Sequence, residues 1–288
     1  MTPARRGLLF ALAATAFIAV LEFWGGVTSH SLALTSDAVH VCMDLFALAL
    51  ALVAAIGAAR PADRRRTFGY GRIEVLGALV NGTLLLVATI AIAYEAIRRF
   101  GSPVEPHATT MTIVAAVGFA FNVCVGAMLH RAGAADLNLR AALFHVLGDV
   151  LGGAAVIAGG IVIAFTRDAW IDPALSLFVA AIIVVGVFRL MRDATEVLLE
   201  SVPGDVDDAT LMTHLERIGG VSGVHDLHVW SIASGSHALS AHVLLEDRRL
   251  SEATAILRDI NDCLQSDFGI THVTIQFECD NCPIVVKH

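Results

Sequence analysis

Six long apolar stretches constrain this chain more than any other feature. They occupy about residues 7–28, 32–59, 73–95, 109–130, 138–165 and 171–191, and each holds the roughly 20 apolar residues that a helix needs to cross a bilayer. Only 16% of the 288 residues are charged and 56% are hydrophobic, whereas a soluble domain carries about 25% charge. The pattern predicts an all-α, six-helix transmembrane domain over residues 1–199 and excludes a water-soluble enzyme.

The distribution of arginines predicts the orientation of these spans. An even number of crossings places both termini on one side, and eleven arginines then fall on that side against three on the other. Basic residues gather in cytoplasmic segments, so we expect cytoplasmic N- and C-termini. Arg5 and Arg6 precede the first stretch as they would in a signal peptide, but five further spans follow, so we interpret it as an uncleaved span.

The last 89 residues form a second compartment with different chemistry. Pro203 and Gly204 mark the join, and the net charge changes from +1 over residues 1–199 to −9 over residues 200–288. The expected order is a helix at 205–218, strands at 221–232 and 237–246, a helix at 251–265 and a strand at 272–278. This αββαβ order predicts a small cytoplasmic α+β domain, a ferredoxin-like arrangement that lacks its first strand.

Two pairs of ionisable residues interrupt the apolar stretches. His40 and Asp44 lie in the second stretch, and His145 and Asp149 lie in the fifth. A spacing of four residues puts imidazole and carboxylate on one helix face, and a charge at the bilayer centre costs about 2.5 to 3.5 kcal/mol on insertion scales. Two such helices facing each other would supply two nitrogens and two oxygens, which suits Zn²⁺. Hydrogen-bonded helix contacts are the structural alternative, but the repeated pattern favours a metal site.

Other polar residues in the spans receive a lesser role. Asp37, one turn before His40, is expected to begin the helix or to act as a gate residue rather than as a fifth ligand. We expect helix contacts or access-path groups, not ligands, at Glu22, Glu74, Asn81 and Asn122. Cys42 and Cys124 are expected to be small apolar fillers.

Several motifs resemble the cation diffusion facilitator family. They are Ser36–His40 with Asp44, the loop TFGYGRIE from Thr67 to Glu74, and the later VHDLHVW and THVTIQFE. The resemblance spans nearly the whole chain and is strongest to the bacterial zinc, cobalt and cadmium efflux branch. It implies a homodimeric antiporter of the bacterial inner membrane that exports a divalent metal in exchange for protons. The family's transport site would fall on the two His/Asp pairs.

The resemblance also implies a preferred metal. Histidine in the second span is typical of zinc-selective members, so Zn²⁺ is the expected substrate. Cobalt, cadmium, nickel or iron export with the same four ligands is the alternative, because ligand type alone does not select among these metals. Protons can drive such a site, since metal binds neutral imidazole and ionised carboxylate and is displaced when these groups are protonated.

The loop between the second and third spans departs from some relatives. It reads RPADRRRTFGYGR and contains no histidine, so we do not predict the additional metal site that those relatives carry there. Its arginines are expected to hold the loop at the anionic inner leaflet or to pair with acidic residues of the tail domain.

The tail domain is predicted to bind metal as well. Seven of the twelve histidines lie after residue 200 in a domain of net charge −9, which attracts cations. The resemblance implies His225, His242 and Glu278 as ligands, completed by Asp226, by water or, as a weaker candidate, by His272. Ordinary surface histidines on an acidic face are the alternative.

Cys279 and Cys282 form a single C-x-x-C near the chain end. A lone pair of this kind is a weak signal for zinc. It could complete a site with a partner chain, transfer metal or have no role.

Two other functional classes also use intramembrane His and Asp residues. An intramembrane metalloenzyme is disfavoured because no H-E-x-x-H motif or evident general base accompanies the pairs. A haem-binding bundle would use His40 and His145 as axial ligands. We therefore expect a transporter rather than an enzyme, with no nucleic-acid partner because no long basic patch is present.

Overall fold

The structure is a computed structural model that describes residues 3–279 except 59, 103, 133–136, 234 and 247–248. Side chains are described from residue 15, except those at 59, 103, 129, 131–145, 234, 247–248 and 250. The described chain forms two compact units. One contains residues 1–50 and 80–191, and the other contains residues 51–79 and 192–288. The loop between the second and third long helices thus groups with the C-terminal part of the chain.

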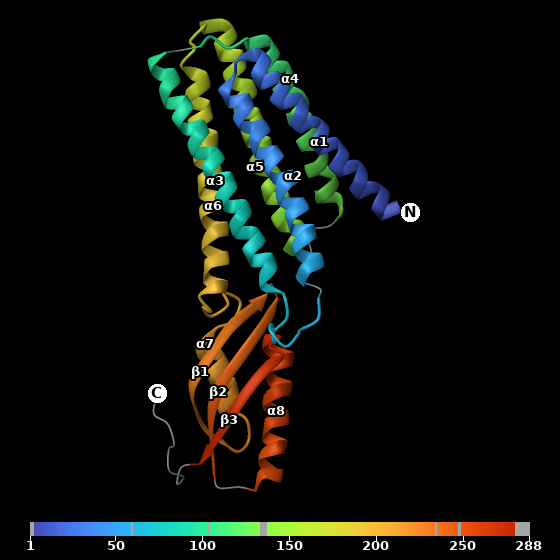
Figure 1. The fold of residues 1–288 in the computed structure, drawn as a ribbon, viewed down its shortest axis with the longest axis vertical. Coiled ribbons are helices and arrows are strands. Elements are labelled where there is room, and N and C mark those ends of the chain that lie inside the picture. The colour runs from blue at the N-terminus through green and yellow to red at the C-terminus, as the bar shows by residue number, and fades with distance from the viewer. Residues whose placement is uncertain are drawn as a thin grey trace. The chain divides into compact units, whose positions relative to one another are not determined.

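Six long helices make up the N-terminal two thirds of the protein (Figure 1). They are α1 (Pro3–Ser29), α2 (Leu32–Ala58), α3 (Arg72–Gly101), α4 (Ala108–Ala132), α5 (Leu137–Thr166) and α6 (Ile171–Leu198). Within the described residues, α2 to α6 are long and apolar enough to cross a membrane, and α1 runs over 27 residues, of which the described side chains begin at Thr15. The predicted bundle of apolar membrane helices is confirmed.

Two apolar clusters hold the helices together. In the first, Leu34 of α2, Met111 of α4 and Val156 of α5 are almost fully buried. In the second, Leu85 of α3 packs against Val179, Ile183 and Val187 of α6. Large side chains such as Phe165 and Phe188 stay exposed on the outside, as expected for helices that are surrounded by lipid.

The C-terminal domain is a three-stranded sheet with two helices. Its elements are α7 (Asp208–Glu216), β1 (Val221–Ala233), β2 (Ser236–Leu245), α8 (Leu250–Phe268) and β3 (His272–Cys279). The strand order is β1-β2-β3, with β1 antiparallel and β3 parallel to β2. This arrangement confirms the predicted αββαβ fold.

The two helices pack on one face of this sheet and form the hydrophobic core with it. We call the opposite face of the sheet the open face. Leu215 of α7 and Ile260 of α8 share one buried cluster with Leu239, Ala241 and Val243 of β2. Because side chains alternate along a strand, the residues between these positions lie on the opposite face. That open face carries His242.

Candidate metal sites

His40 lies between two carboxylates inside the helical bundle. Its Nε2 is 3.6 Å from Asp44 Oδ2, one turn further along α2, and 3.5 Å from Asp149 Oδ1 on α5. The three side chains are only 14–27% exposed. The structure therefore brings together three of the four residues of the predicted transport site. The side chain of His145 lies outside the described residues, although its backbone is in α5 one turn before Asp149.

A cavity of about 500 Å³ opens beside these three residues. Its polar lining also includes Asp37 and Asn81, and its apolar lining comes mainly from α6, including Val179, Ile182 and Ile183. The side-chain oxygen Oδ1 of Asn81 is buried without a hydrogen-bond partner among the described residues. The cavity thus presents oxygen and nitrogen ligands to a cation and an apolar wall on one side.

The expectation that Asp37 begins its helix is wrong. Helix α2 starts at Leu32, so Asp37 lies in its second turn, 7% exposed, and lines the cavity. The N-terminus of α2 is capped by other groups, so Asp37 is not needed there. Its alternative assignment as a gate residue stays a prediction.

Glu22 of α1 is a second buried carboxylate in the bundle. It is 1% exposed, and its Oε2 has no hydrogen-bond partner in the described part of the chain. Its Oε1 occupies the space where any side chain at position 118 would place its Cβ. Any larger residue at that position would force this carboxylate to move.

Asp172 is a buried residue that the sequence did not single out. It lies in the first turn of α6 with no exposed surface, and it accepts hydrogen bonds from Ser31 Oγ (2.6 Å), Leu32 N (2.6 Å) and Ala33 N (3.2 Å). Arg99 Nη1 lies 3.6 Å from its Oδ2 and donates to the carbonyl of His30 at 2.7 Å. The carboxylate therefore caps α2 and ties α3 and α6 to the α1–α2 turn.

A second group of candidate ligands lies on the open face of the C-terminal sheet. His225 of β1 and His242 of β2 are register partners, and their rings meet edge to face at 5.2 Å. Glu278 of β3 links them, with Oε2 3.0 Å from His225 Nε2 and Oε1 3.0 Å from His242 Nδ1. The structure thus brings the three residues implied by the resemblance into one cluster.

A β-bulge adds a fourth group to this cluster. The register of β1 shifts between His225 and His228, and Asp226 has a φ of 49°. Its Oδ2 lies 3.6 Å from His242 Nε2, and its Oδ1 lies 3.1 Å from His228 Nε2. Asp226 is therefore placed to complete the donor set.

The donor set suits a divalent metal such as Zn²⁺. One ligand atom from each of His225, His242 and Glu278 lies within 4.8 Å of the others, and tetrahedral zinc holds nitrogen and oxygen ligands about 3.4 Å apart. The hydrogen bond from Gln276 Nε2, helped by the two histidines, lowers the pKa of Glu278. The carboxylate is thus kept in the ionised form that binds metal.

The remaining tail-domain candidates are not brought to the cluster. His272 begins β3 six residues before Glu278, which is about 20 Å along a strand, and its ring packs edge-on against Phe68 at 5.9 Å. Cys279 ends β3 and takes part in a disulfide, so it offers no thiolate to a metal. Cys282 lies outside the described residues.

Comparison with known proteins relates both parts of the chain to cation efflux. The cation efflux transmembrane domain matches residues 8–199, and the cytoplasmic domain of cation efflux proteins matches residues 203–280. The metal cation efflux system protein CzcD of Cupriavidus metallidurans is 41% identical over 277 residues, which cover 96% of this chain and 87% of that protein. The cadmium, cobalt and zinc/H(+)-K(+) antiporter of Bacillus velezensis is 40% identical over 90% of this chain and 83% of its own. The zinc transporter ZitB of Escherichia coli is 37% identical over 96% of this chain and 88% of its own.

Proposed function

This chain belongs to the cation efflux, or cation diffusion facilitator, family, and on that premise we propose that it exports divalent cations, Zn²⁺ foremost, in exchange for protons. It is a multi-pass membrane protein, and its family is one of transporters rather than of enzymes. The observation that carries the proposal is the position of His40 between Asp44 and Asp149, on two different helices beside a cavity.

The transport site is proposed to consist of His40, Asp44, His145 and Asp149. Two imidazoles and two carboxylates match the ligand number and type that Zn²⁺ accepts. Asp37 and Asn81 line the same cavity, and we assign them to the access path, with Asp37 as a gate. Their oxygens can replace part of the ion's hydration shell as it enters.

Protons drive release of the ion by competing for the same atoms. An imidazole nitrogen and a carboxylate oxygen bind metal only when they carry no proton. When the ion leaves, carboxylates in a low-dielectric bundle cannot all remain charged, so at least one takes up a proton. Alternating access then lets the site load metal from the cytoplasm and protons from outside.

Zn²⁺ is the proposed main substrate, with Cd²⁺ and Co²⁺ as further candidates. ZitB is named as a zinc transporter, and the Bacillus velezensis relative is named for cadmium, cobalt and zinc. Nickel and iron are the remaining alternatives, because the same four ligands can also bind these metals.

The proposal assigns residues 1–199 to transport and residues 200–288 to a cytoplasmic, metal-responsive domain. The arginine distribution supports cytoplasmic N- and C-termini, and we propose a bacterial inner membrane as the location. His225, His242 and Glu278, with Asp226, would hold the tail-domain metal, which supplies a positive charge that links β1, β2 and β3. Two copies of the chain are proposed to form a homodimer, which light scattering of the purified protein would test.

Vesicle transport tests the main proposal. The full-length protein is reconstituted in vesicles that are acidic inside and contain a zinc-sensitive dye, and uptake of Zn²⁺, Cd²⁺, Co²⁺ and Ni²⁺ is measured side by side. Asp149→Asn should reduce uptake to near background, whereas Asp168→Asn, the same change at an exposed loop residue, should not. Undiminished uptake by Asp149→Asn would refute the ligand assignment, and uptake that ignores the proton gradient would refute antiport.

A further inference from the structure

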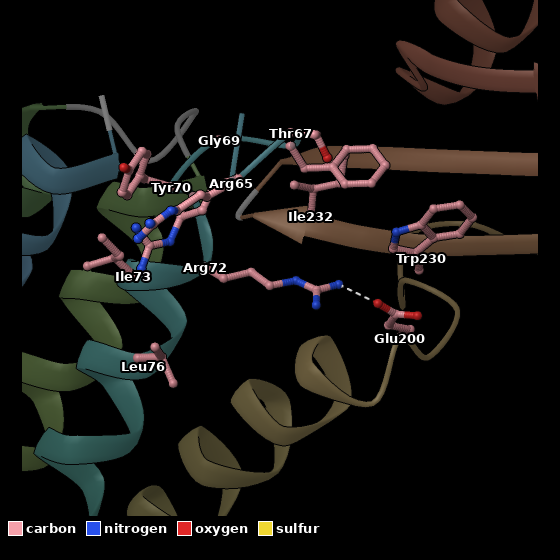
Figure 2. A pocket seen from close by; sticks show the side chains of 13 residues that line it. Arg65, Thr67, Gly69, Tyr70, Arg72, Ile73, Leu76, Glu200, Trp230 and Ile232 are labelled. Atoms are coloured by element: carbon pink, nitrogen blue, oxygen red, sulfur yellow. Dashed lines mark hydrogen bonds and ion pairs between the residues drawn. The ribbon is translucent and has the colours of Figure 1, made fainter. Parts of the chain in front are cut away.

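The structure contains a pocket of about 580 Å³ that metal transport does not use (Figure 2). It is formed by the loop before α3, the first turns of α3, Glu200 after the end of α6, and the last part of β1. All of these belong to the unit of residues 51–79 and 192–288. Its lining combines Arg65, Arg66 and Arg72 with Ile73, Leu76 and Trp230. A pocket that joins guanidinium groups to apolar side chains suits an amphiphilic anion.

The arginines of this pocket outnumber its carboxylates. Arg72 Nη2 donates to Glu200 Oε1 at 2.7 Å, so those two charges cancel. The guanidinium carbon of Arg66 lies 4.6 Å from the ring centroid of Tyr70, and Figure 2 shows Arg65 beside Tyr70 and Ile73, away from Glu200. Among the described side chains, neither Arg65 nor Arg66 lies in a salt bridge. Glu200, the carboxylate of the lining, thus pairs with Arg72 and not with these two arginines, while Asp63, outside the lining, interacts electrostatically with Arg66.

Asp63 fixes the loop that presents these arginines. Its Oδ1 accepts the backbone N–H groups of Arg65 and Arg66, both at 2.7 Å, and its Oδ2 accepts the hydroxyl of Tyr70 at 2.7 Å. These hydrogen bonds, the one from Tyr70 foremost, lower the pKa of Asp63. The turn closes with the N–H of Gly69 on the carbonyl of Arg66 at 2.9 Å, at a φ of 80° that favours glycine. The loop is thus organised before any ligand arrives.

Contacts with the sheet close the pocket on its other side. A Cβ at Gly71 would lie 2.5 Å from the Cβ of Ala233, so the loop touches the end of β1 closely. Phe68 packs against His272 at the start of β3. One of the two predicted roles of the loop arginines, pairing with an acidic residue of the tail domain, applies to Arg72, which pairs with Glu200.

The pocket is lined by the first turns of a helix that is long and apolar enough to cross a membrane. Helix α3 begins at Arg72 and is long enough to span a bilayer, so its first turn lies near the membrane surface. Leu76, one turn into α3, is 51% exposed. Arginine binds phosphate through a planar fork of donors, which a phosphodiester can accept.

We propose that this pocket binds an anionic phospholipid, with Arg65 and Arg66 on the headgroup phosphate and Ile73 and Leu76 along the glycerol and acyl part. A free phosphate ion would present the same oxygens to the arginines, but it has no apolar group that could contact Ile73 and Leu76. The proposal goes beyond metal export and does not depend on it.

Native mass spectrometry of the full-length protein in a mild detergent tests this binding. The probes are dioctanoyl phosphatidylglycerol, dioctanoyl phosphatidylcholine and inorganic phosphate, and the measured quantity is the dissociation constant of the first lipid bound. Arg65→Gln/Arg66→Gln should weaken phosphatidylglycerol binding at least about tenfold, because both direct guanidinium contacts with the phosphate are lost. Arg60→Gln/Arg64→Gln removes the same charge from the same loop outside the pocket and should weaken it less than about threefold.

Further arms separate the possible ligands and guard against a folding defect. Arg65→Lys/Arg66→Lys keeps the charge but loses the fork, so it should bind with intermediate affinity. If an equal concentration of inorganic phosphate displaced phosphatidylglycerol, the pocket would be a site for free phosphate, and the lipid assignment would be overturned. Equal losses in the two Gln pairs, or equal affinity for phosphatidylcholine and phosphatidylglycerol, would overturn the proposal.

Discussion

Asp172→Asn is the substitution that best tests the packing of the bundle. The change keeps the shape of the side chain and one acceptor oxygen, but it removes the negative charge near Arg99 and replaces an acceptor with an N–H₂ donor. That donor would face the N–H of Leu32 or the hydroxyl of Ser31, which now meet the carboxylate at 2.6 Å. Because Asp172 is fully buried, water cannot replace the lost acceptor.

The loss of stability follows from these contacts. A hydrogen bond to a charged group contributes about 1.5 to 3 kcal/mol, and an unsatisfied buried donor costs about 1 to 3 kcal/mol. Loss of one charge-assisted bond to the α2 N-terminus, together with a weakened Arg99 contact, gives a destabilisation of about 3 kcal/mol. At 2 to 4 °C per kcal/mol for a protein of this size, the melting temperature should fall by about 6 to 12 °C.

Thermal unfolding of the purified full-length protein measures this effect. Asp168→Asn, an exposed residue four positions earlier, is the matched control and should change the melting temperature by less than about 2 °C. In a double-mutant cycle with Arg99→Gln, the combined loss should be smaller than the sum of the single losses, because the two residues share one network. A fall no larger than that of the control, or strict additivity, would refute the reasoning.

Three further predictions concern other parts of the chain. Gly118→Ala should displace the Glu22 carboxylate, whose oxygen occupies that space, and should reduce vesicle Zn²⁺ uptake by at least about tenfold, while the same change at Gly101, which is exposed at the end of α3 with open space beside it, should leave uptake intact. Glu278→Gln should weaken zinc binding to the tail cluster by at least about tenfold at every pH from 5 to 7.5 in chelator competition, because the lowered pKa keeps Glu278 ionised, and so able to bind metal, across this window. For the same reason the stability that ionised Glu278 contributes is present above its ordinary pKa and is lost only as pH falls through the lowered value. Gly269→Ala should destabilise the tail domain by about 1 kcal/mol, because the residue ends α8 with a φ of 67°, and a chemical denaturation curve identical to wild type would contradict this.

Residues related by helical or strand periodicity were predictable from the sequence. The four-residue spacing of His40 and Asp44 places them on one face whatever the tertiary packing, and its repetition on α5 indicated the partner helix. The order of helices and strands followed from hydropathy and alternation in the same way. These features depend on local spacing, which the sequence contains directly.

Residues whose partners lie far along the chain were not predictable. Asp172 reads as an ordinary acidic residue in the first turn of its own helix, yet it caps α2, about 140 residues earlier. Asp226 was one of several residues expected to complete the tail-domain ligands, but its place could not be predicted: a regular strand would turn it to the face opposite His225, and the bulge brings it into the cluster. His272, expected only as a weaker candidate, lies at the other end of β3 from Glu278, so the length of the strand separates the two side chains.

The length of β1 has a mechanical consequence. His225, beside one bulge, and Ala233, against Gly71, are eight residues apart on one strand, about 26 Å, and the pairing shifts register again between Ser231 and Ala233. A tilt of about 2.5° at the first bulge would move the far end of a straight strand of this length by about 1 Å. Because the strand meets Gly71 just beyond its second irregularity, we expect the loop that leads into α3 to receive the part of this movement that the irregularity does not absorb.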